Sequence, residues 1–366
     1  MAEFKRFVLI NVVPPVINHE AALYDLEELK SLVSTFGGST IVRIIQRKDS
    51  PDSHTYIGSG KVEELKGIVK NDYIDVIVIN DIVKPTQLFH LKESLWSVNH
   101  RIEVWDRMDL ILQIFDKHAY TAEAKLQIEL ARMRHMGPRI YGMGQILSRQ
   151  GGGIGTRGIG ETNTELMRRH WRTAMKEVQE KLSRLERDRL KKLEHRRERG
   201  LRTVSIVGYT NAGKTTLFNA LTRKQKKAAN VLFATLDSSI GKIYLPTLKE
   251  EVLVSDTIGF IQNLPPSLIQ AFKSTLMESI HADLLLHVID LSDPRKYEKI
   301  EVVENILSNL HIDDKKTVYV FNKTDAITAY DKKHIEEMYA VYHPLFISAR
   351  NKEDIQQVEE TVGKYL

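Results

Sequence analysis

The stretch Gly208-Tyr-Thr-Asn-Ala-Gly-Lys-Thr215 determines the fold class of this 366-residue chain. It has the GxxxxGK(S/T) spacing of a phosphate-binding loop. The apolar run 203–207 before it predicts a strand, and residues 216–221 after it predict the first turns of a helix. A glycine turn with an accidental Gly-Lys-Thr would not explain that context. Strand, loop and helix in this order predict an α/β P-loop domain that binds a nucleoside triphosphate.

The chemistry of the loop follows from its backbone and two of its side chains. The amide N–H groups of the loop and of the helix N-terminus form an anion-binding nest for phosphates. Lys214 is expected to bring its charge to the β- and γ-phosphates as a catalytic group, and the Thr215 hydroxyl is the expected Mg²⁺ ligand. The predicted nucleotide-binding residues of this segment are Gly208, Tyr209, Thr210, Asn211, Ala212, Gly213, Lys214, Thr215 and Thr216.

The segment Asn322-Lys-Thr-Asp325 indicates which base is bound. It follows the apolar run 316–321, which predicts a buried strand. The Asp325 carboxylate would accept hydrogen bonds from guanine N1–H and the exocyclic amine, a pair that adenine does not offer. Asn322 and Lys323 would brace the loop and cover the base. A polar helix-capping turn is the alternative for the tetrapeptide alone, but its place downstream of a phosphate loop favours a guanine site.

Two further segments complete the predicted nucleotide site. Asp256-Thr-Ile-Gly259 follows a strand-like run and has the DxxG pattern. Asp256 is expected to hold Mg²⁺ through a water, and the Gly259 N–H is expected to sense the γ-phosphate during catalysis. Ser348 and Ala349, which also follow a strand-like run, fit the last guanine-contacting loop.

Thr235 is the candidate for a switch threonine that closes over Mg²⁺. It lies in the loop between the phosphate-binding helix and the DxxG segment. A single threonine in a loop usually has no such role, so the assignment rests on its position and on the resemblance described below. The predicted metal ligands are therefore Thr215, Thr235 and Asp256.

The residue after the DxxG glycine is Phe260, where Ras-type GTPases have a glutamine that orients the attacking water. A phenyl ring cannot hydrogen-bond a water, so we expect slow intrinsic hydrolysis that depends on a partner or a bound ion. Asn211 is a candidate for holding K⁺ beside the phosphates, where the ion would act catalytically like an arginine finger. The alternative is that Asn211 only braces the loop, and equal GTPase rates in equimolar KCl and NaCl would favour that alternative.

The composition is that of a globular protein with more than one domain. Hydrophobic residues make up 42% of the chain, and the net charge is +5. Apolar runs are far shorter than a membrane span, so we expect no stable membrane insertion and a cytoplasmic location. The absence of cysteine excludes disulfides and thiolate metal sites. No group of histidines and carboxylates has the sequence spacing of a metal site.

Residues 1–118 alternate between strand and helix patterns, which predicts a small parallel α/β subdomain with crossover helices. The expected strands are 7–13, 40–46, 74–79 and 101–105. The expected helices are 19–35, 61–71, 86–97 and 107–115. The P-loop GTPase domain is predicted to occupy residues 201–366.

Residues 119–200 predict a long antiparallel helical hairpin between these two parts. Apolar side chains recur at helical spacing along 121–136 and again along 162–200. The second segment holds thirteen Lys or Arg and seven Asp or Glu, so the positive charge of the chain is concentrated there. A basic helix suits a polyphosphate partner such as RNA, and simple solvation is the alternative that charge alone leaves open.

The predicted tip of the hairpin is the loop 148–161, which contains six glycines and two arginines. Glycine lets backbone amides approach an anionic surface closely, and arginine pairs with phosphates or stacks on bases. A disordered linker is the alternative, but a position between two helices favours a presented tip. The predicted RNA-binding residues are Arg149, Gly151, Gly152, Gly153, Arg157, Arg168 and Arg169.

Together these motifs resemble the HflX family of GTPases, in the Obg–HflX group of translational P-loop GTPases. The most specific is the block Leu147-Ser-Arg-Gln-Gly-Gly-Gly-Ile-Gly-Thr-Arg-Gly158, and segments 56–64, 123–130, 233–237 and 256–260 extend the resemblance over nearly the whole chain. The resemblance implies a protein that binds GTP or GDP and contacts rRNA of the large ribosomal subunit. It also implies that the GTP state dissociates stalled or idle ribosomes into subunits, often under stress, and that hydrolysis resets the protein. We expect a monomer with no DNA partner.

One departure from the family pattern lies beside the glycine block. The family has a proline at the place of Ile159, and a proline would stiffen the loop. Two other functions stay open: an RNA-binding or remodelling GTPase that acts away from the ribosome, and a scaffold that only senses GTP. The intact phosphate loop and DxxG segment favour an enzyme.

Overall fold

The computed structural model describes residues 4–150, 157–224, 232–233, 239–265, 268–269, 276–328 and 332–366, without the side chains of 138, 140–150 and 157–164. The chain divides into two compact units. The first unit consists of Met1–Lys117 and Ile128–Glu180, and the second consists of His118–Gln127 and Lys181–Leu366. Each helix of the hairpin therefore contributes to both units. The division into three parts at residues 118 and 200 stays a prediction.

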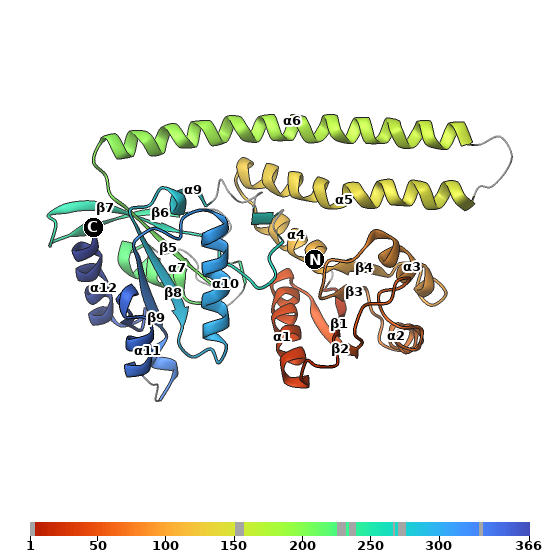
Figure 1. Ribbon diagram of the computed structural model, residues 1–366, viewed down its shortest axis with the longest axis horizontal. Helices are drawn as coiled ribbons and strands as arrows, with labels where there is room; N and C mark the ends of the chain where they lie inside the picture. Colours follow the sequence, from red (N-terminus) through yellow and green to blue (C-terminus); the bar gives the residue numbers. More distant parts are fainter. Residues whose placement is uncertain are drawn as a thin grey trace. The chain divides into compact units, whose positions relative to one another are not determined.

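The first unit is built on a parallel sheet of four strands in the order β2-β1-β3-β4 (Figure 1). Its strands are β1 (Arg6–Val13), β2 (Ser39–Arg47), β3 (Val76–Ile79) and β4 (Glu103–Asp106). Its crossover helices are α1 (His19–Phe36), α2 (Ser59–Asn71), α3 (Pro85–Leu95) and α4 (Arg107–His118). Strand β3 is buried along its whole length, as expected for a strand covered on both faces. The predicted α/β subdomain is confirmed.

Helix α1 shows how local sequence sets the ends of these elements. Asn18 caps its N-terminus, because the side-chain oxygen accepts a 2.7 Å hydrogen bond from the Ala21 N–H. Gly37 ends the helix in the left-handed conformation with φ of 91°, which costs glycine little. The predicted helix 19–35 therefore differs from the observed one by a single residue.

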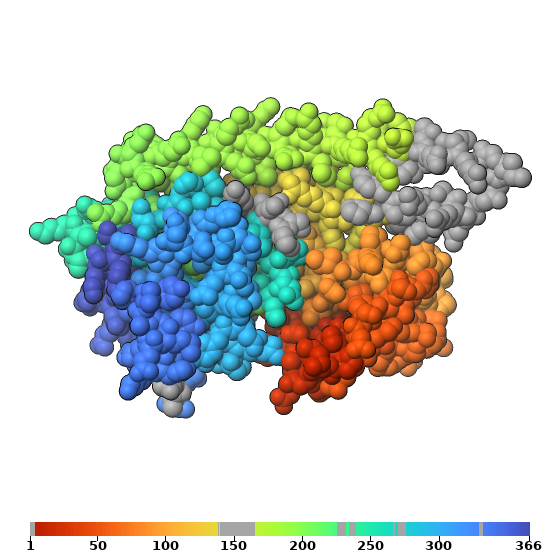
Figure 2. Space-filling model, in the orientation of Figure 1, coloured from red at the N-terminus to blue at the C-terminus, as the bar shows by residue number. Residues whose placement is uncertain are grey.

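The hairpin helices are α5 (Ala122–Gln150) and α6 (Arg157–Glu198). Residues 148–150 and 157–161 are helical, so the predicted tip loop 148–161 was too long. A glycine inside a helix costs about 1 kcal/mol relative to alanine. Extending a helix that has already formed is cooperative, so a cost of this size does not end it. Within the first unit, the Trp171 indole N–H donates a 3.0 Å hydrogen bond to the Met133 carbonyl and ties the two helices together. The outer face of α6 is exposed over many turns (Figure 2).

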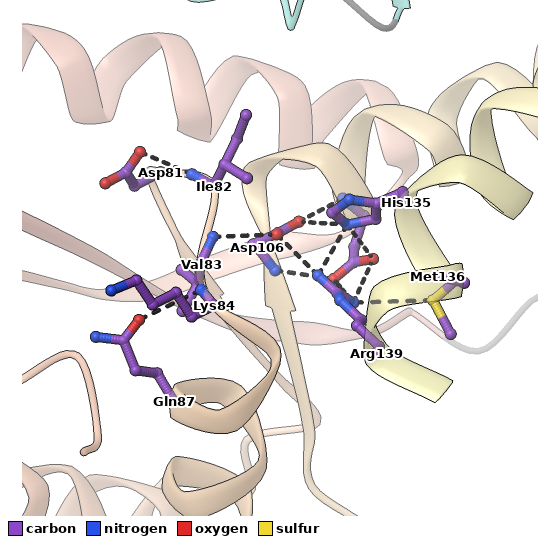
Figure 3. A network of polar contacts seen from close by, with 10 residues as sticks. Asp81, Ile82, Val83, Lys84, Gln87, Asp106, His135, Met136 and Arg139 are labelled. Carbon is purple, nitrogen blue, oxygen red and sulfur yellow. Dashed lines mark hydrogen bonds and ion pairs between the residues drawn. The ribbon is translucent and has the colours of Figure 1, made fainter. Parts of the chain in front are cut away.

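A network of buried charges connects α5 to the start of α4 (Figure 3). The Asp106 and Asp109 carboxylates each accept the backbone N–H of the other residue, at 2.8 and 3.0 Å, in a capping box. Arg139 on α5 pairs with both carboxylates, at 2.8 and 2.7 Å. His135, one turn earlier, lies 3.2 Å from each. No sequence motif marks this cluster, because its members come from the end of β4, from α4 and from α5.

The second unit contains a sheet of six strands in the order β10-β9-β8-β5-β7-β6 (Figure 1). The strands are β5 (Thr203–Gly208), β6 (Ser239–Leu245), β7 (Glu250–Asp256), β8 (Leu284–Asp290), β9 (Thr317–Asn322) and β10 (Leu345–Phe346). All neighbours are parallel except β6 and β7. The named helices of this unit are α7 (Lys214–Thr222), α9 (Met277–Ile280), α10 (Lys296–Asn309), α11 (Lys332–Met338) and α12 (Lys352–Tyr365).

This arrangement confirms the predicted P-loop α/β fold. Valines of three central strands, Val204, Val288 and Val320, are fully buried and form part of a continuous apolar core. In an open parallel sheet, ligands bind beyond the carboxyl ends of the strands. The predicted nucleotide-binding segments follow β5, β7, β9 and β10 at that edge. Among the helices described here, none is long and apolar enough to cross a membrane.

Candidate nucleotide-binding site

Two glycines give the phosphate loop its shape. Gly208 has φ of 145°, and a Cβ there would lie 2.3 Å from the Val288 carbonyl oxygen of the neighbouring strand. Gly213 has φ of 98°, and a Cβ there would lie 2.2 Å from Asn322 Nδ2. Both positions combine a left-handed backbone with a lack of space, so a side chain would be strained at either one. The loop therefore leaves β5 and enters α7 along a path that requires glycine.

Lys214 places a positive charge inside this loop. Its ammonium donates hydrogen bonds to the carbonyl oxygens of Gly208 at 3.0 Å and Tyr209 at 2.7 Å. Burial lowers the pKa of Lys214 to about 8, and the negative charge of Asp256 partly opposes that effect. A bound phosphate would favour the charged ammonium again, because an opposite charge nearby raises the pKa of a lysine.

The Thr215 hydroxyl and the Asp256 carboxylate form the predicted metal-binding pair. Thr215 Oγ1 lies 3.0 Å from Asp256 Oδ2, and Asp256 is fully buried at the end of β7. A hydroxyl and a carboxylate are hard oxygen donors of the kind that Mg²⁺ prefers, so these residues fit a magnesium ion. The third predicted ligand, Thr235, lies outside the described residues.

Asn322 joins three of the predicted segments. Its Nδ2 donates a 2.9 Å hydrogen bond to the Ala212 carbonyl in the phosphate loop. Its Oδ1 accepts a 2.9 Å hydrogen bond from the Ala349 N–H in the loop after β10. The side chain is almost completely buried, so both bonds are shielded from water. One amide therefore fixes the phosphate loop relative to the loops predicted to contact guanine.

The remaining residues of the predicted guanine site lie around Asn322. Lys323 has φ of 67°, and its ammonium pairs with Asp290 at the end of β8, at 2.6 Å. Asp325 lies in a short 3₁₀ turn with its carboxylate 44% exposed and 3.8 Å from Arg350. The Ser348 N–H donates to Asp354, which holds the last loop against α12. Asp290, with its ion pair to Lys323, is a residue that the sequence analysis did not identify.

The DxxG segment lies directly against the phosphate loop. The Phe260 N–H donates to the Gly208 carbonyl at 3.2 Å, and the Thr210 N–H donates to the Phe260 carbonyl at 2.7 Å. A Cβ at Gly259 would lie 2.8 Å from Lys214 Nζ, so a side chain there would collide with the ammonium. The Phe260 ring is buried, as expected for a residue that packs in the core and does not orient water. Asn211 is exposed at the turn of the loop with φ of 64°.

His287 is a buried neighbour of the site that the sequence analysis missed. It lies in β8, and its ring packs against that of Tyr319 at a tilt of 57°, with the ring centres 4.8 Å apart. Burial, together with the nearby charge of Lys214, lowers the pKa of His287 to about 3. The imidazole is therefore neutral at physiological pH and adds no positive charge beside Lys214. A polar residue inside the apolar run 284–289 was its only sign in the sequence.

The predicted RNA-binding residues are only partly described. Arg168 is half-buried and Arg169 is exposed on α6. Gly151, Gly152 and Gly153 lie outside the described residues, as do the side chains of Arg149 and Arg157. Their contact with RNA therefore stays a prediction.

Three family models match consecutive parts of the chain. They are described as GTP-binding GTPase N-terminal over residues 24–116, GTP-binding GTPase Middle Region over residues 118–197, and 50S ribosome-binding GTPase over residues 203–323. Their borders lie near the predicted boundaries at residues 118 and 200.

Similar proteins cover nearly the whole chain. A GTPase HflX of Caldanaerobacter subterraneus subsp. tengcongensis is 41% identical over 99% of this chain and 81% of its own length. The GTPase HflX of Escherichia coli K12 is 38% identical over 93% of this chain and 78% of its own length. Among solved structures, the SsGBP–GDP complex is 22% identical with a TM-score of 0.54, and covers 99% of this chain and 98% of the other. That structural likeness shows the shared fold.

Proposed function

Because this chain belongs to the HflX family of GTPases, we propose that it binds the large ribosomal subunit and, with GTP bound, separates stalled or idle ribosomes into subunits. The chain is a GTP-binding protein and a GTP hydrolase. The description of the family model that matches residues 203–323, a 50S ribosome-binding GTPase, supports the ribosomal partner. The basic helix α6 supports an RNA partner, because neutralising phosphates with Lys and Arg is the main source of affinity for nucleic acid.

The observation that carries the nucleotide part of the proposal is the pair of hydrogen bonds made by Asn322. They hold the phosphate loop and the guanine-contacting loop in one arrangement through a single buried amide. Asp325 would then accept two hydrogen bonds from the guanine base. Lys214 would exchange its two carbonyl partners for phosphate oxygens, which raises its pKa and keeps it charged.

The nucleotide would be bound together with Mg²⁺. Thr215 and Asp256 would hold the ion, Asp256 through a water, and Thr235 is proposed as the ligand that switches with the nucleotide. When bound, the ion would neutralise charge on the β- and γ-phosphates. Asn211 is also proposed as the candidate that would hold a K⁺ ion beside the phosphates, and the alternative is that it only braces the loop. Its side chain is exposed at the turn of the loop.

Hydrolysis by the free protein is proposed to be slow. Phe260 is buried and is held to the phosphate loop through its backbone, so its side chain cannot align a water molecule. The missing group would come from the ribosome or from a bound ion. Slow hydrolysis suits a protein that must act in its GTP state before it is reset.

Sedimentation through a sucrose gradient tests this function. Ribosomes are incubated with the protein and GTP, GDP or a non-hydrolysable GTP analogue. We expect the protein in the large-subunit fraction and a loss of intact ribosomes with the analogue, and weaker association with GDP. A variant with Arg168→Gln and Arg169→Gln should bind more weakly, with a smaller salt dependence. The matched control, Lys332→Gln and Lys333→Gln on α11, should bind as the wild type does.

Absence of the protein from large-subunit and ribosome fractions in every nucleotide state would contradict the proposal. Binding to free RNA in the same experiment would then favour the alternative of an RNA-remodelling GTPase.

A further inference from the structure

Glu278 is a buried carboxylate that no sequence motif identified. It lies in α9, the short helix of the second unit that the chain enters after the DxxG segment. Its side chain is only 6% exposed. An ionised carboxylate is rarely buried unless it is paired, because its desolvation is unfavourable. Its partners therefore indicate why the position is charged.

Those partners belong to the root of the hairpin, which we define as residues 118–127 of α5 and its preceding turn together with residues 181–198 of α6. Arg196 Nη1 lies 3.3 Å from Glu278 Oε2, and Arg189 Nη2 lies 3.6 Å from Glu278 Oε1. Arg189 also pairs with Glu123 of α5 at 3.3 Å. One carboxylate thus joins α9 to α6, and through Arg189 to α5.

The residue after Glu278 connects α9 to the nucleotide site. The hydroxyls of Ser279 and Ser205 on β5 are 2.8 Å apart, and Ser255 on β7 donates to Ser205 at 3.1 Å. All three serines are buried. Strand β5 ends in the phosphate loop, and Ser255 directly precedes Asp256. Because hydrogen bonds are directional, this chain of hydroxyls links the position of α9 to the strands that carry the nucleotide-binding residues.

A cleft of about 370 Å³ lies beside the ion pairs. Its lining includes both arginines, Glu123, Glu278 and Ile240 at the start of β6. Strand β6 follows the segment that contains Thr235, the proposed switch threonine, and α9 follows the DxxG segment. The cleft therefore lies beside β6 and α9, the elements that follow the Thr235 segment and the DxxG segment along the chain. It gives the side chains of Arg189, Arg196 and Glu278 room to change partners.

We propose that Glu278 is a positioning residue that couples the nucleotide site to the root of the hairpin. This inference rests on the proposed GTP-dependent switching. A shift of the DxxG segment between the GDP and GTP states would move α9. The distances from the Glu278 carboxylate to Arg196 and to Arg189 would then change, and with them the strength of the two ion pairs. Because allosteric coupling is reciprocal, a partner that bends the hairpin would alter the relative affinity for GDP and GTP through the same residue.

Hydrogen–deuterium exchange of the full chain tests the coupling without ribosomes. Amides of α6 between residues 185 and 198 are compared in GDP and in a non-hydrolysable GTP analogue. In the wild type we expect exchange rates that differ by about fivefold or more between the two nucleotides, the lower end of usual allosteric coupling. Glu278→Gln should abolish that difference and leave the affinity for the analogue nearly unchanged. Glu278→Asp, which keeps the charge, should restore part of it.

The matched control is Glu298→Gln, which removes an exposed ion pair with Arg295 on α10 and should leave the difference intact. Arg196→Gln removes the more exposed partner of the same ion pair and should also abolish the difference. It provides the test if Glu278→Gln does not fold. A nucleotide-dependent difference that persists in both Glu278→Gln and Arg196→Gln would overturn the inference, as would a wild type without any difference. A failure of ribosome binding alone would appear in sedimentation and leave this result unaffected.

Discussion

Single side chains hold the nucleotide site in shape. Asn322 bonds to two loops, and a missing Cβ at Gly213 leaves the space that its amide occupies. Asp325 differs from Asn322, because its carboxylate is exposed and pairs with Arg350 only at 3.8 Å. The buried amide therefore organises the site, and the exposed carboxylate is available to the base. We therefore expect substitutions of Asn322 and of Asp325 to have different effects on the site.

Asp325→Asn should change the specificity for the base. The amide cannot accept both hydrogen bonds of guanine, and we expect a loss of about 1.5–3 kcal/mol, roughly 10- to 150-fold in the Kd for GTP. Xanthine carries a carbonyl at the place of the guanine amine, so affinity for xanthosine triphosphate should rise. Titration with fluorescent nucleotides measures both. Arg350→Gln is the control, and an equal loss of GTP affinity in that variant would mean that the ion pair, not base recognition, is responsible.

At the scale of elements, the contact between α5 and α4 depends on charge. Burial disfavours the charged form of His135, but hydrogen bonds to Asp106 and Asp109 outweigh it and raise the pKa to about 9. The pKa of Asp109 is lowered in spite of burial, because His135 and Arg139 favour the carboxylate. The charges that face His135 are therefore two carboxylates and one guanidinium. The interactions that hold α5 to α4 are therefore strongest while His135 carries its proton.

The stability of the first unit should fall between about pH 7 and pH 9. An unfolded histidine has a pKa of about 6.5, so the extra stability is complete below that value and is lost as pH rises through the folded pKa. We expect a loss of roughly 1–3 kcal/mol, reduced by the partial exposure of the cluster. Trp96, Trp105 and Trp171 all belong to the first unit, so tryptophan fluorescence during urea unfolding reports on it alone.

His135→Gln should lower stability near pH 6.5 and flatten its dependence up to pH 9. His170→Gln, an exposed site on α6, is the matched control and should keep the wild-type profile. If the stability of His135→Gln fell between pH 7 and pH 9 as much as that of the wild type, groups other than His135 would be the cause of the pH dependence.

The elements differ in how far the sequence could predict them. Most central strands were predicted, because runs buried on both faces are continuously apolar, but the central strand β8 was not, although residues 284–286 and 288–289 are apolar. Strand β6 was not predicted, although Gly241, Ile243 and Leu245 alternate with exposed residues as expected for an edge strand. The networks around Glu278 and Arg139 could not be predicted, because their members belong to different elements and meet only after those elements have packed. The meeting of the phosphate loop, the DxxG segment and the two predicted guanine-contacting loops could be predicted, since each follows a strand at the same edge of the sheet.

At the scale of the whole molecule, the predicted nucleotide-binding residues and the predicted RNA-binding residues of α6 belong to different units. The phosphate loop, the DxxG segment and the predicted guanine-binding residues all belong to the second unit. The part of α6 that carries the half-buried Arg168 and the exposed Arg169 belongs to the first unit. Multidomain chains commonly unfold in more than one transition, and a ligand stabilises only the part that binds it. The binding of nucleotide therefore distinguishes the units experimentally.

GDP should raise the melting temperature of the second unit and leave that of the first almost unchanged. At a concentration of 100 times the Kd, a ligand adds about 2.7 kcal/mol, which corresponds to a shift of roughly 5–10 °C for a unit of this size. Differential scanning calorimetry follows both transitions, and tryptophan fluorescence follows the first alone. With Asp325→Asn at the same GDP concentration, the calorimetric shift should shrink and the fluorescence midpoint should stay in place. Equal shifts in both signals would mean that the units unfold as one cooperative body, in which nucleotide and hairpin would be coupled through global stability as well as through Glu278.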